Sequence, residues 1–596
     1  MTGAIVGEWA RLLFGSLARA GVKDVVVSPG SRSTPFVWAA AATPGLVCHS
    51  LYDERSAAFF ALGLARVTGE APLLVCTSGS AAANYFPAVV EASLAHHPLL
   101  VMTADRPLEL QDAGAPQTID QVKLYGDFAR SFFDLGVPDP APASLAALVR
   151  SVAQAALSAK SPIPGPVHLN ARAKKPLEPA EAHTEHELAL VSEVDRLLAR
   201  GVPHAFAARP EPEPQAVAEL ADRLSRAERG VIVCGPLGLA RAAELESIVE
   251  LARKLDMPVY AEATSQLRFG AFADAKLAVD GLDWVLRTPS FVRAALPELV
   301  LQFGGTPVSA GLEQLLSAHA TELAIVAEHG FPDPTSSASF LVRGEPASVA
   351  RAIGERLGGH SPRASQREYT KRLQGASDAA SFWVEAVLAK HGDETICEAE
   401  AIRRTVRALP GGALLVVGNS LPIRELDWYV PTAPHGVAVA CQRGTNGIDG
   451  LISGAAGAAV AARKPTVLLV GDVSFAHDLG GLSAARRVET PFVVVVIDND
   501  GGRIFEQLPV ARLWTRPELA ELWLTPPRLS IADAARAFGV RHAAPTTSSE
   551  LDAELATALE RPGPTIVQVR VAPETTKGQP AEIRKRVAEL GERGER

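Results

Sequence analysis

An α/β fold of parallel β-sheets covered by helices on both faces is predicted by three features of this sequence. Short runs rich in valine, isoleucine and leucine alternate with alanine-rich helical stretches, which is typical of repeated β-α-β units. Nearly every run ends in a turn that contains Gly, Pro, Asp or Ser. The chain has 596 residues, too many for one hydrophobic core. Together these features predict three doubly wound parallel-sheet domains.

The first domain is expected over residues 1–182. It begins with a predicted amphipathic helix in MTGAIVGEWARLLFGSLARAG, where Glu8 and Arg11 interrupt the apolar run that a secretory signal needs. Four strands follow, in VKDVVVSPG, PLLVCTSG, HPLLVMTADRP and PIPGPVHLN. The proline- and charge-rich segments KKPLEPAEAHTEHE and ARPEPEPQ then predict a linker around one short helix.

Two further domains are expected, over residues 198–360 and 393–575. The central domain has predicted strands in GVIVCGP, PVYAEA, LVLQFGG and LAIVAEH. The third has them in GGALLVVGNS, GVAVACQRG, KPTVLLVGD, PFVVVVIDND and TIVQVRV. Residues 576–596 are expected to form a charged C-terminal tail that is helical or frayed.

Composition narrows the class of protein. The net charge of −9 argues against a general nucleic-acid binder. The five cysteines are scattered and form no C-x-x-C pair, which excludes a zinc ribbon and fits a reducing compartment. The strongest apolar run, PFVVVVI, is too short to span a bilayer. We therefore expect a cytoplasmic protein with no nucleic-acid partner and no membrane insertion.

The stretch VLLVGDVSFAHDL places Asp472 directly after a predicted buried strand. By itself this favours a helix cap, because Asp and Ser are common at helix N-termini. However, Asn499 follows 27 positions later at the end of the next strand, and a β-α-β unit of roughly 30 residues returns the chain beside its starting strand. With the carbonyl of Gly501, these two residues predict an oxygen-only half-shell for Mg²⁺. The helix start near Ser474 offers N–H groups to a phosphate.

The segments GDVS and DNDGGRIF resemble the GD-[GS]-x…N signature of thiamine diphosphate (ThDP) enzymes. Their serine and double glycine resemble one family in particular, the SEPHCHC (2-succinyl-5-enolpyruvyl-6-hydroxy-3-cyclohexene-1-carboxylate) synthases of menaquinone biosynthesis. The resemblance implies a pyrimidine (PYR) domain at 1–182, a central domain, a diphosphate (PP) domain at 393–575, and ThDP with Mg²⁺ or Mn²⁺ as cofactors. The implied cofactor contacts are Glu54, Ser78, Gly79, Ile448, Gly471, Asp472, Val473, Ser474, Asn499, Gly501 and Gly502, with Asp472, Asn499 and Gly501 on the metal.

Glu54 opens a predicted helix in HSLYDERSAAFFALGLARVTG. Acidic residues in a first helical turn complement the helix dipole, so a capping role explains Glu54 on its own. The resemblance implies a different role, in which this carboxylic group lies beside the aminopyrimidine ring of ThDP and relays the proton that activates the cofactor. In the ThDP enzymes the glutamate and the diphosphate site come from different subunits. This implies a homodimer or a dimer of dimers, with active sites at the dimer interface.

Arginines concentrate in Gly-, Ser- and Pro-rich turns at predicted strand ends. An arginine in such a turn can bind a carboxylate with two hydrogen bonds, although exposed arginines usually do no more than solvate a surface. The segments SPGSRSTP, TADRP, GAPQTID, GNSLPIRELD and CQRGTNGIDG resemble SEPHCHC synthase motifs. The resemblance assigns catalytic roles to Ser31, Arg32, Glu54 and Gln117, and substrate binding to Arg106, Asn419, Ser420, Arg424, Arg443, Ile504 and Phe505.

The substrates implied by this resemblance are 2-oxoglutarate and isochorismate. The implied transferase reaction is ThDP-dependent decarboxylation of 2-oxoglutarate, followed by Stetter-like 1,4-addition of the succinyl-semialdehyde carbanion to isochorismate, giving SEPHCHC and CO₂. Ile448 would support the bent conformation of ThDP. Two segments depart from the family pattern: Ala310 and Gly311 stand where a basic residue is common, and Pro116 where an asparagine is common.

Three other functions are compatible with parts of the pattern. One is a different ThDP-dependent 2-oxo acid decarboxylase or acetolactate-type ligase, against which the arginine-rich turns count. Another is a non-catalytic ThDP-binding paralogue, which the presence of Glu54, Asp472 and Asn499 disfavours. A nicotinamide-dependent dehydrogenase is disfavoured because no G-x-G-x-x-G opens a helix with a ribose-binding acid at the expected distance.

Overall fold

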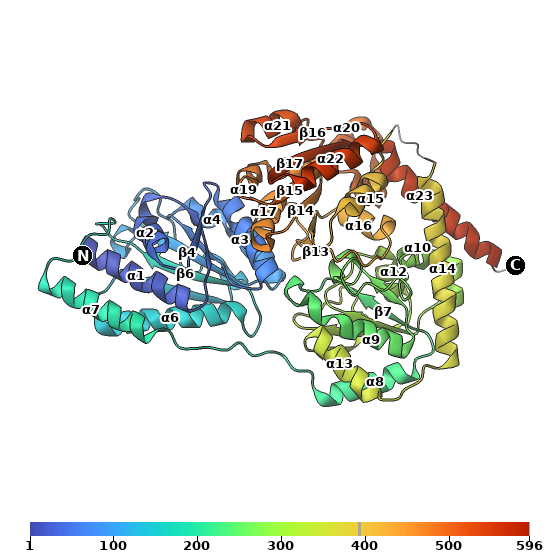
Figure 1. The fold of residues 1–596 in the computed structure, drawn as a ribbon, viewed down its shortest axis with the longest axis horizontal. Helices are drawn as coiled ribbons and strands as arrows, with labels where there is room; N and C mark the ends of the chain where they lie inside the picture. Colours follow the sequence, from blue (N-terminus) through green and yellow to red (C-terminus); the bar gives the residue numbers. More distant parts are fainter. Residues whose placement is uncertain (391–394, 595–596) are drawn as a thin grey trace. The chain divides into compact units, whose positions relative to one another are not determined.

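The structure is a computed structural model that describes residues 1–390 and 395–594, and the chain divides into two compact units (Figure 1). Unit 1 comprises Met1–Ala208, Gln442–Arg463 and Asp478–Val488, and unit 2 comprises Arg209–Cys441, Lys464–His477 and Glu489–Arg596. Each unit is therefore discontinuous in sequence.

Unit 1 contains one six-stranded sheet in which all neighbouring strands are parallel, with the order β2-β1-β3-β4-β6-β5. The strands are β1 (Asp24–Ser28), β2 (Val47–Ser50), β3 (Leu73–Cys76), β4 (Leu99–Asp105), β5 (Ser131–Gly136) and β6 (Pro166–Arg172). Every residue of β3, β4 and β6 is buried, whereas the edge strands β2 and β5 are partly exposed. Continuous burial of this kind is expected of central strands in a parallel sheet covered on both faces.

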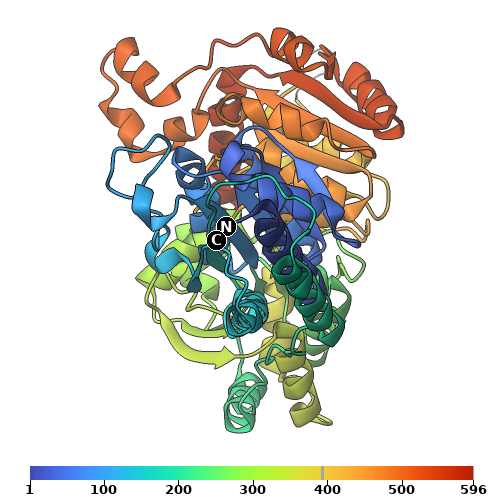
Figure 2. The same cartoon turned by 90° about the vertical axis from the view of Figure 1, so that its left-hand side faces the viewer.

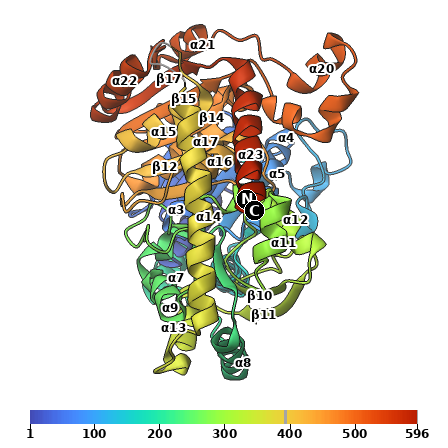
Figure 3. The same cartoon turned by 90° about the vertical axis from the view of Figure 1, so that its right-hand side faces the viewer.

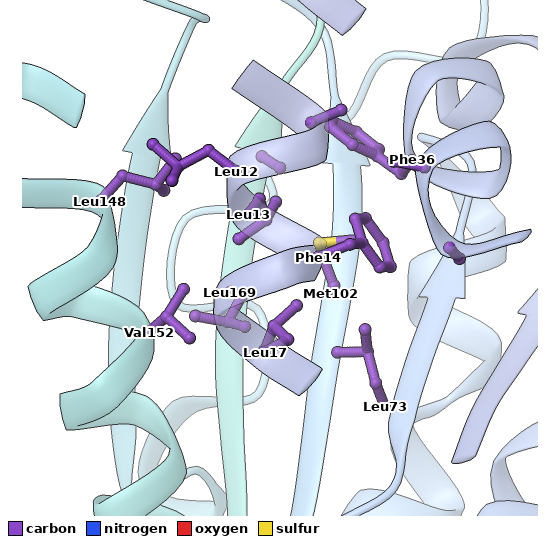
Figure 4. Close-up of a cluster of buried hydrophobic side chains, with 14 of the residues drawn as sticks. Leu12, Leu13, Phe14, Leu17, Phe36, Leu73, Met102, Leu148, Val152 and Leu169 are labelled. Atoms are coloured by element: carbon purple, nitrogen blue, oxygen red, sulfur yellow. The ribbon is translucent and has the colours of Figure 1, made fainter. Parts of the chain in front are cut away.

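The helices of unit 1 pack on its sheet or on one another. They are α1 (Gly3–Arg19), α2 (Thr34–Ala42), α3 (Glu54–Thr68), α4 (Ser80–Asn84), α5 (Phe86–Leu94), α6 (Pro142–Lys160), α7 (Glu185–Arg200), α17 (Leu451–Ala462) and α19 (Leu482–Ala485). Helix α1 packs against α2, α6 and α7, and Figure 2 shows α1 beside α7. Figure 4 shows Leu13, Phe14 and Leu17 of α1 among the buried side chains of this core, with Met102 from the sheet. The predicted N-terminal amphipathic helix is therefore part of the hydrophobic core of unit 1.

Helices α3 and α17 approach each other closely, and glycines make this possible. A Cβ atom on Gly63 of α3 would lie 2.0 Å from the carbonyl oxygen of Gly454 on α17. A Cβ atom on Gly457 would lie 1.9 Å from the carbonyl oxygen of Phe60. Because side chains at these positions would collide with backbone, the glycines fix α17 against the helix that begins with Glu54.

Unit 2 contains two parallel sheets. The five-stranded sheet has the order β11-β10-β9-β7-β8 and the six-stranded sheet the order β13-β12-β14-β15-β17-β16. The strands of the first are β7 (Gly230–Cys234), β8 (Val259–Ala261), β9 (Leu299–Phe303), β10 (Glu322–Ala327) and β11 (Ala338–Arg343). Those of the second are β12 (Leu414–Val417), β13 (Ala438–Cys441), β14 (Thr466–Gly471), β15 (Pro491–Asp498), β16 (Arg541–Ala543) and β17 (Gly563–Arg570).

The helices of unit 2 pack around these two sheets. In the segment that forms the five-stranded sheet, the helices are α8 (Pro214–Arg226), α9 (Glu246–Leu255), α10 (Leu282–Leu286), α11 (Pro289–Ala295), α12 (Ala310–Ala318) and α13 (Pro346–Leu357). The others are α14 (Ala364–Leu388), α15 (Glu398–Ala408), α16 (Leu421–Tyr429), α18 (Asp472–His477), α20 (Pro517–Leu524), α21 (Ile531–Phe538), α22 (Ser548–Glu560) and α23 (Pro573–Gly594). Figure 3 shows α14 and α23 side by side, and Ile583 and Val587 of α23 are buried in a shared cluster. The expected C-terminal tail is thus part of a helix that ends at residue 594 and packs through Ile583 and Val587.

Three parallel sheets with flanking helices confirm the predicted α/β fold class. Every strand expected from the sequence is present. The strands that were not expected, β2, β5, β11 and β16, all lie at sheet edges. The domain boundaries at 1–182, 198–360 and 393–575 stay predictions. Across the described residues, no helix combines the length and apolarity needed to cross a membrane.

Candidate active site

The carboxyl edge of the unit 1 sheet gathers most of the candidate residues from the first third of the chain. Because β1, β3 and β4 are adjacent and parallel, the turns that follow them lie along one edge. Ser31 and Arg32 follow β1, Ser78 and Gly79 follow β3, and Arg106 follows β4. Open parallel sheets bind ligands at this edge.

Arg32 is buried at this edge, with 4% of its surface exposed. Its Nη1 donates a hydrogen bond of 2.7 Å to the carbonyl oxygen of Ala173, just after β6. Among the residues that the structure describes, no partner accepts a hydrogen bond from its Nε. A buried guanidinium with an unused N–H favours an anionic ligand, because leaving a buried donor unpaired is costly. Ser31, in contrast, is exposed.

Two hydrogen bonds hold the segment that carries Gln117 against the same edge. Nη2 of Arg106 donates to the carbonyl oxygen of Pro116 at 2.8 Å, and Oγ of Ser78 donates to the carbonyl oxygen of Gln117 at 2.9 Å. Gln117 is exposed and has a φ of +52°, in the left-handed region. The structure therefore brings together three residues predicted from separate motifs.

A buried polar network that no sequence pattern indicated lies beneath this segment. The carboxylate of Asp105 accepts a hydrogen bond from Nδ2 of Asn170 at 2.9 Å and lies 3.1 Å from Nη1 of Arg172. Nε2 of Gln121 donates to Oδ1 of Asn170 at 3.2 Å, and its Oε1 accepts from the amide of Gly79 at 3.0 Å. The network joins the end of β4 to β6 and to the turn after β3.

Glu54 is the first residue of α3, as predicted, but the helix cap is a different residue. Oδ1 of Asp53 accepts a hydrogen bond from the amide of Ser56 at 3.1 Å, so Asp53 performs the capping role. Burial, and to a smaller extent the negative charge of Glu54, raises the pKa of Cys76 at the end of β3. Glu54 follows β2, which pairs in parallel with β1, so it belongs to the same sheet edge. Arg443 and Ile448 also belong to unit 1, in the loop before α17.

In unit 2, the carboxyl edge of the six-stranded sheet carries the predicted metal ligands. β14 and β15 pair with Gly471 opposite Ile497, so Asp472 and Asn499 follow adjacent strand ends, as the 27-residue spacing predicted. Oδ2 of Asp472 accepts a hydrogen bond of 2.8 Å from the amide of Gly501, and its Oδ1 accepts one of 2.8 Å from the amide of Val473. The first of these bonds joins the two strand ends directly.

The electrostatics of this edge fit a hard cation. Burial, reinforced by the charges of Asp498 and Asp500, raises the pKa of Asp472 to about 6, against the effect of its two backbone hydrogen bonds. Asn499 is 5% exposed, and in the described part of the chain its Oδ1 has no hydrogen-bond partner. Within residues 1–390 and 395–594, no group of three or more His, Cys, Asp or Glu is placed to hold a metal ion. A metal at this edge would therefore combine one carboxylate with amide, carbonyl and non-protein oxygens.

The turn after Asn499 is fixed by Arg503 and by Leu524. Gly501 has a φ of +119°, and a Cβ atom there would lie 2.4 Å from the carbonyl oxygen of Leu524, so only glycine fits. Arg503 donates from Nε to the carbonyl oxygen of Asn499 at 2.9 Å. The carbonyl oxygen of Gly501 accepts the amide of Arg503 at 2.8 Å, which leaves its second lone pair for a metal. The candidates Gly471, Val473, Gly502, Ile504 and Phe505 are half-buried, and Ser474 is buried.

The end of β12, beside β14, carries three further candidates at the same edge. Asn419 is buried, with its Oδ1 3.5 Å from Sγ of Cys441. Ser420 has a φ of +73°, and its carbonyl oxygen accepts a hydrogen bond of 2.6 Å from Nη1 of Arg424. Such strain in a non-glycine residue costs on the order of 1–3 kcal/mol and is concentrated at functional sites. Arg424 thereby stabilises the start of its own helix, α16.

Comparison with known proteins identifies the family. Residues 8–124 match the family described as "Thiamine pyrophosphate enzyme, N-terminal TPP binding domain", and residues 439–569 match "Thiamine pyrophosphate enzyme, C-terminal TPP binding domain". The chain is 44% identical to the 2-succinyl-5-enolpyruvyl-6-hydroxy-3-cyclohexene-1-carboxylate synthase of Sorangium cellulosum (strain So ce56), over 98% of this chain and 96% of that protein. It is 41% identical to the synthase of the same name from Geobacillus kaustophilus (strain HTA426), over 95% of each chain.

This chain belongs to the SEPHCHC synthase family.

Two solved structures align with this SEPHCHC synthase family member over most of its length and support its fold independently of the sequence relatives. Benzoylformate decarboxylase from Polynucleobacter necessarius aligns with a TM-score of 0.68 at 17% identity, covering 95% of this chain and 99% of that chain. A putative thiamin diphosphate-dependent enzyme from Mycobacterium smegmatis aligns with a TM-score of 0.69 at 20% identity and the same coverage. The three-sheet architecture predicted for ThDP enzymes is therefore confirmed.

A buried acidic pair, Glu398 and Glu425, lies behind Asn499 in this SEPHCHC synthase family member, and no sequence motif predicts it. Oε1 of Glu398 accepts a hydrogen bond from Nδ2 of Asn499 at 3.3 Å, and its Oε2 accepts one from Oγ1 of Thr576 at 2.7 Å. Glu425 hydrogen-bonds to Glu398, and burial together with the charge of Glu398 raises the pKa of Glu425 well above its usual value. Nothing in the sequence distinguishes these glutamates from the exposed acids of other helices.

Gly311, one of the residues that depart from the SEPHCHC synthase pattern, is required by the local packing. The amide of Gly311, in the first turn of α12, donates to Oδ1 of Asp283 at 2.9 Å. A Cβ atom on Gly311 would lie 2.7 Å from the carbonyl oxygen of Asp283. A larger residue would therefore push α12 away from α10. At the other departure, Pro116 supplies the carbonyl oxygen that Arg106 holds.

Proposed function

We propose that this chain decarboxylates 2-oxoglutarate and joins the remaining succinyl unit to isochorismate, giving SEPHCHC and CO₂ in menaquinone biosynthesis. The observation that carries the proposal is a likeness extending over nearly the whole chain. Eight relatives that bear this synthase's name are 36–44% identical to the chain over at least 90% of it. In chemical terms, the keto carbon of 2-oxoglutarate loses CO₂ and forms a carbon–carbon bond to isochorismate.

ThDP, when bound, supplies the nucleophilic carbon and the electron sink that decarboxylation of a 2-oxo acid requires. Glu54 is assigned the proton transfer at the aminopyrimidine ring. Its position at a sheet edge, free of the capping role that Asp53 performs, supports this assignment. Ser78, Gly79 and Ile448 would hold the cofactor in unit 1.

The metal is proposed to be Mg²⁺, with Mn²⁺ as an alternative, at Asp472, Asn499 and the carbonyl of Gly501. The raised pKa of Asp472 and the unpaired, buried Oδ1 of Asn499 support it, because a cation would relieve both. Gly471, Val473, Ser474 and Gly502 are proposed to lie beside the diphosphate, at the strand ends that carry Asp472 and Asn499.

The arginines are proposed to bind the carboxylates of the two substrates. Buried Arg32, with its unused Nε–H, supports this role best, since a carboxylate would satisfy that donor. The remaining members of the proposed substrate-binding set are Ser31, Arg106, Gln117, Asn419, Ser420, Arg424, Arg443, Ile504 and Phe505. A homodimer or a dimer of dimers with shared active sites, and a cytoplasmic location, complete the proposal.

The test is product analysis by mass spectrometry. Purified protein supplied with ThDP and Mg²⁺ should release CO₂ from 2-oxoglutarate and form a carbon–carbon adduct with isochorismate, and omission of ThDP or of the metal should abolish both. Pyruvate replaces 2-oxoglutarate in the control reaction. Adduct formed with pyruvate but not with 2-oxoglutarate would assign the chain to another ThDP-dependent ligase instead.

A further inference from the structure

The loop that precedes α17, residues 442–450, carries two members of the proposed site, Arg443 and Ile448, and we call it the Arg443 loop. Thr445 and Asn446 at its tip are exposed, and Asn446 has a φ of +59°. A loop with an exposed tip and three glycines is expected to be mobile unless contacts fix it. How this loop is held therefore decides how well Arg443 is presented.

A single buried carboxylate, that of Glu91 on α5, holds the first half of the Arg443 loop. Oε1 of Glu91 accepts a hydrogen bond from the amide of Gly444 at 2.9 Å. Its Oε2 accepts two more, from the amide of Thr445 at 2.6 Å and from the hydroxyl of Thr445 at 2.8 Å. Glu91 is 1% exposed, and Nη2 of Arg66 lies 3.8 Å from its Oε1. Three donors and a buried cation compensate the cost of burying this charge.

The fit between Glu91 and the loop leaves no room for a side chain. A Cβ atom on Gly444 would lie 2.6 Å from the carbonyl oxygen of Glu91 and 2.9 Å from its Oε2. The loop backbone is thus seated directly on α5, one residue after Arg443.

Two further contacts fix the rest of the Arg443 loop. Nε2 of Gln442 donates to the carbonyl oxygen of Asp449 at 2.8 Å, which closes the base of the loop. At its end, a Cβ atom on Gly450 would lie 2.0 Å from the ring of Phe59 on α3, the helix that Glu54 begins. Gln442 directly precedes Arg443, and Glu91 binds the two residues that directly follow it.

We propose that Glu91 is a positioning residue, which clamps the Gly444 and Thr445 amides so that Arg443 is presented to a substrate carboxylate. The inference rests on the proposed function, because it takes Arg443 as a substrate-binding residue. Ordering a mobile loop on binding costs backbone conformational entropy, and a loop that is already fixed avoids that cost. The clamp should therefore act on substrate binding more than on turnover.

Glu91→Gln tests the proposal with little change in side-chain volume. Glutamine has one acceptor oxygen, and its NH₂ group would face an amide donor, so at least one of the three hydrogen bonds is lost. We expect KM for one of the two acids to rise about tenfold or more, with kcat changed by less than about threefold. Thr445→Val, which removes only the hydroxyl bond, should give a smaller rise. Ser93→Ala, on the same helix and also buried, should leave KM unchanged.

A double-mutant cycle separates positioning from general destabilisation. In an Arg443→Ala background, Glu91→Gln should have no further effect on KM, because the residue through which it acts is gone. Hydrogen exchange should show the Gly444 and Thr445 amides protected in the wild type and unprotected in Glu91→Gln, whether or not the protein is active. Equal KM effects in both backgrounds, or unchanged exchange in Glu91→Gln, would overturn the clamp. A wild type that makes no product but keeps these amides protected would instead count against the proposed function alone.

Discussion

The unit 1 sheet and the six-stranded sheet of unit 2 have the same strand order, yet their carboxyl edges differ in chemistry. In both sheets the order is second, first, third, fourth, sixth, fifth strand along the chain. In both, candidate residues follow the first, third and fourth strands. Those turns carry Arg32, Ser78 and Arg106 in unit 1, and Asn419, Asp472 and Asn499 in unit 2.

In both sheets, topology determines where the ligand-binding groups lie, and residue type determines what they bind. The unit 1 edge supplies guanidinium groups, which suit carboxylates. The unit 2 edge supplies a buried carboxylate and an unpaired amide oxygen, which suit a metal ion. Substitutions at matched positions of the two edges should therefore disturb different steps of the reaction.

The largest effect is expected at Glu54, the acid of the unit 1 edge. Glu54→Gln keeps the size of the side chain but removes the proton that the proposed relay needs. We expect kcat to fall by about 10²–10⁴-fold, the usual contribution of a general acid–base group, while metal affinity at the unit 2 edge is retained. Asp53→Asn is the matched control, because it alters the neighbouring cap and should change stability by about 1 kcal/mol or less with kcat retained. Full turnover by Glu54→Gln would support a different proton relay.

The next largest effect is expected at Arg424, a cation at the carboxyl edge of the six-stranded sheet of unit 2. Arg424→Ala should raise KM for a dicarboxylate substrate, with a loss of about 2–3 kcal/mol in transition-state stabilisation for one charged hydrogen bond. Arg424→Lys should recover part of that loss, since lysine keeps the charge but cannot form a bidentate pair of hydrogen bonds to a carboxylate. Steady-state kinetics with each acid in turn shows which substrate is affected. Unchanged kinetics in Arg424→Ala would remove this residue from the site.

A somewhat smaller effect is expected at Glu398, behind the proposed metal ligand Asn499. Its carboxylate holds the Asn499 NH₂ group and so leaves Oδ1 for the metal. Glu398→Leu should weaken Mg²⁺ binding about 10–100-fold, as is usual for partners of metal ligands, whereas Glu398→Gln keeps one acceptor and should bind near normally. Calorimetric titration of Mg²⁺ into the ThDP-loaded protein measures the metal affinity of both variants. Glu345→Gln, another buried glutamate of unit 2, is the control for loss of burial alone.

Local sequence patterns were sufficient to predict the central strands and the placement of Asp472 and Asn499 at adjacent strand ends. Both depend on one β-α-β unit, in which an apolar run marks the strand and a short spacing fixes the return. Four strands at sheet edges were not predicted, and two of them lack such runs: β2 is VCHS and largely exposed, and β16 is RHA.

Residues contributed by distant segments could not be predicted from the sequence. Glu398 and Thr576 lie 101 and 77 positions from Asn499, and only tertiary packing brings α15 and α23 to it. Glu91 is 353 positions from Gly444. No periodicity or spacing rule relates such positions. For this reason, the sequence revealed groups at strand ends but not the residues that hold them.

The smallest expected effect concerns acid stability and should distinguish the two sheets. His168 on β6 is buried, its Nε2 lies 2.8 Å from Oγ1 of Thr103, and burial lowers its pKa from the usual 6.5 to about 4. Unfolding therefore takes up a proton between these pH values, so the stability that neutral His168 confers is complete above pH 6.5 and is lost as the pH falls towards 4. The free energy of unfolding falls by at most about 1.4 kcal/mol per pH unit on this account.

His168→Gln keeps a group that can hydrogen-bond to Thr103 but cannot ionise in this range, so its unfolding free energy should fall less steeply between pH 6.5 and 5 than that of the wild type. The corresponding strand of unit 2, β17, contains no histidine. Hydrogen exchange corrected for intrinsic pH dependence should therefore show acid-induced loss of protection in β4 and β6 but not in β15 and β17. An equal loss in both sheets, or identical pH slopes for His168→Gln and the wild type, would mean that other groups determine the acid sensitivity of unit 1.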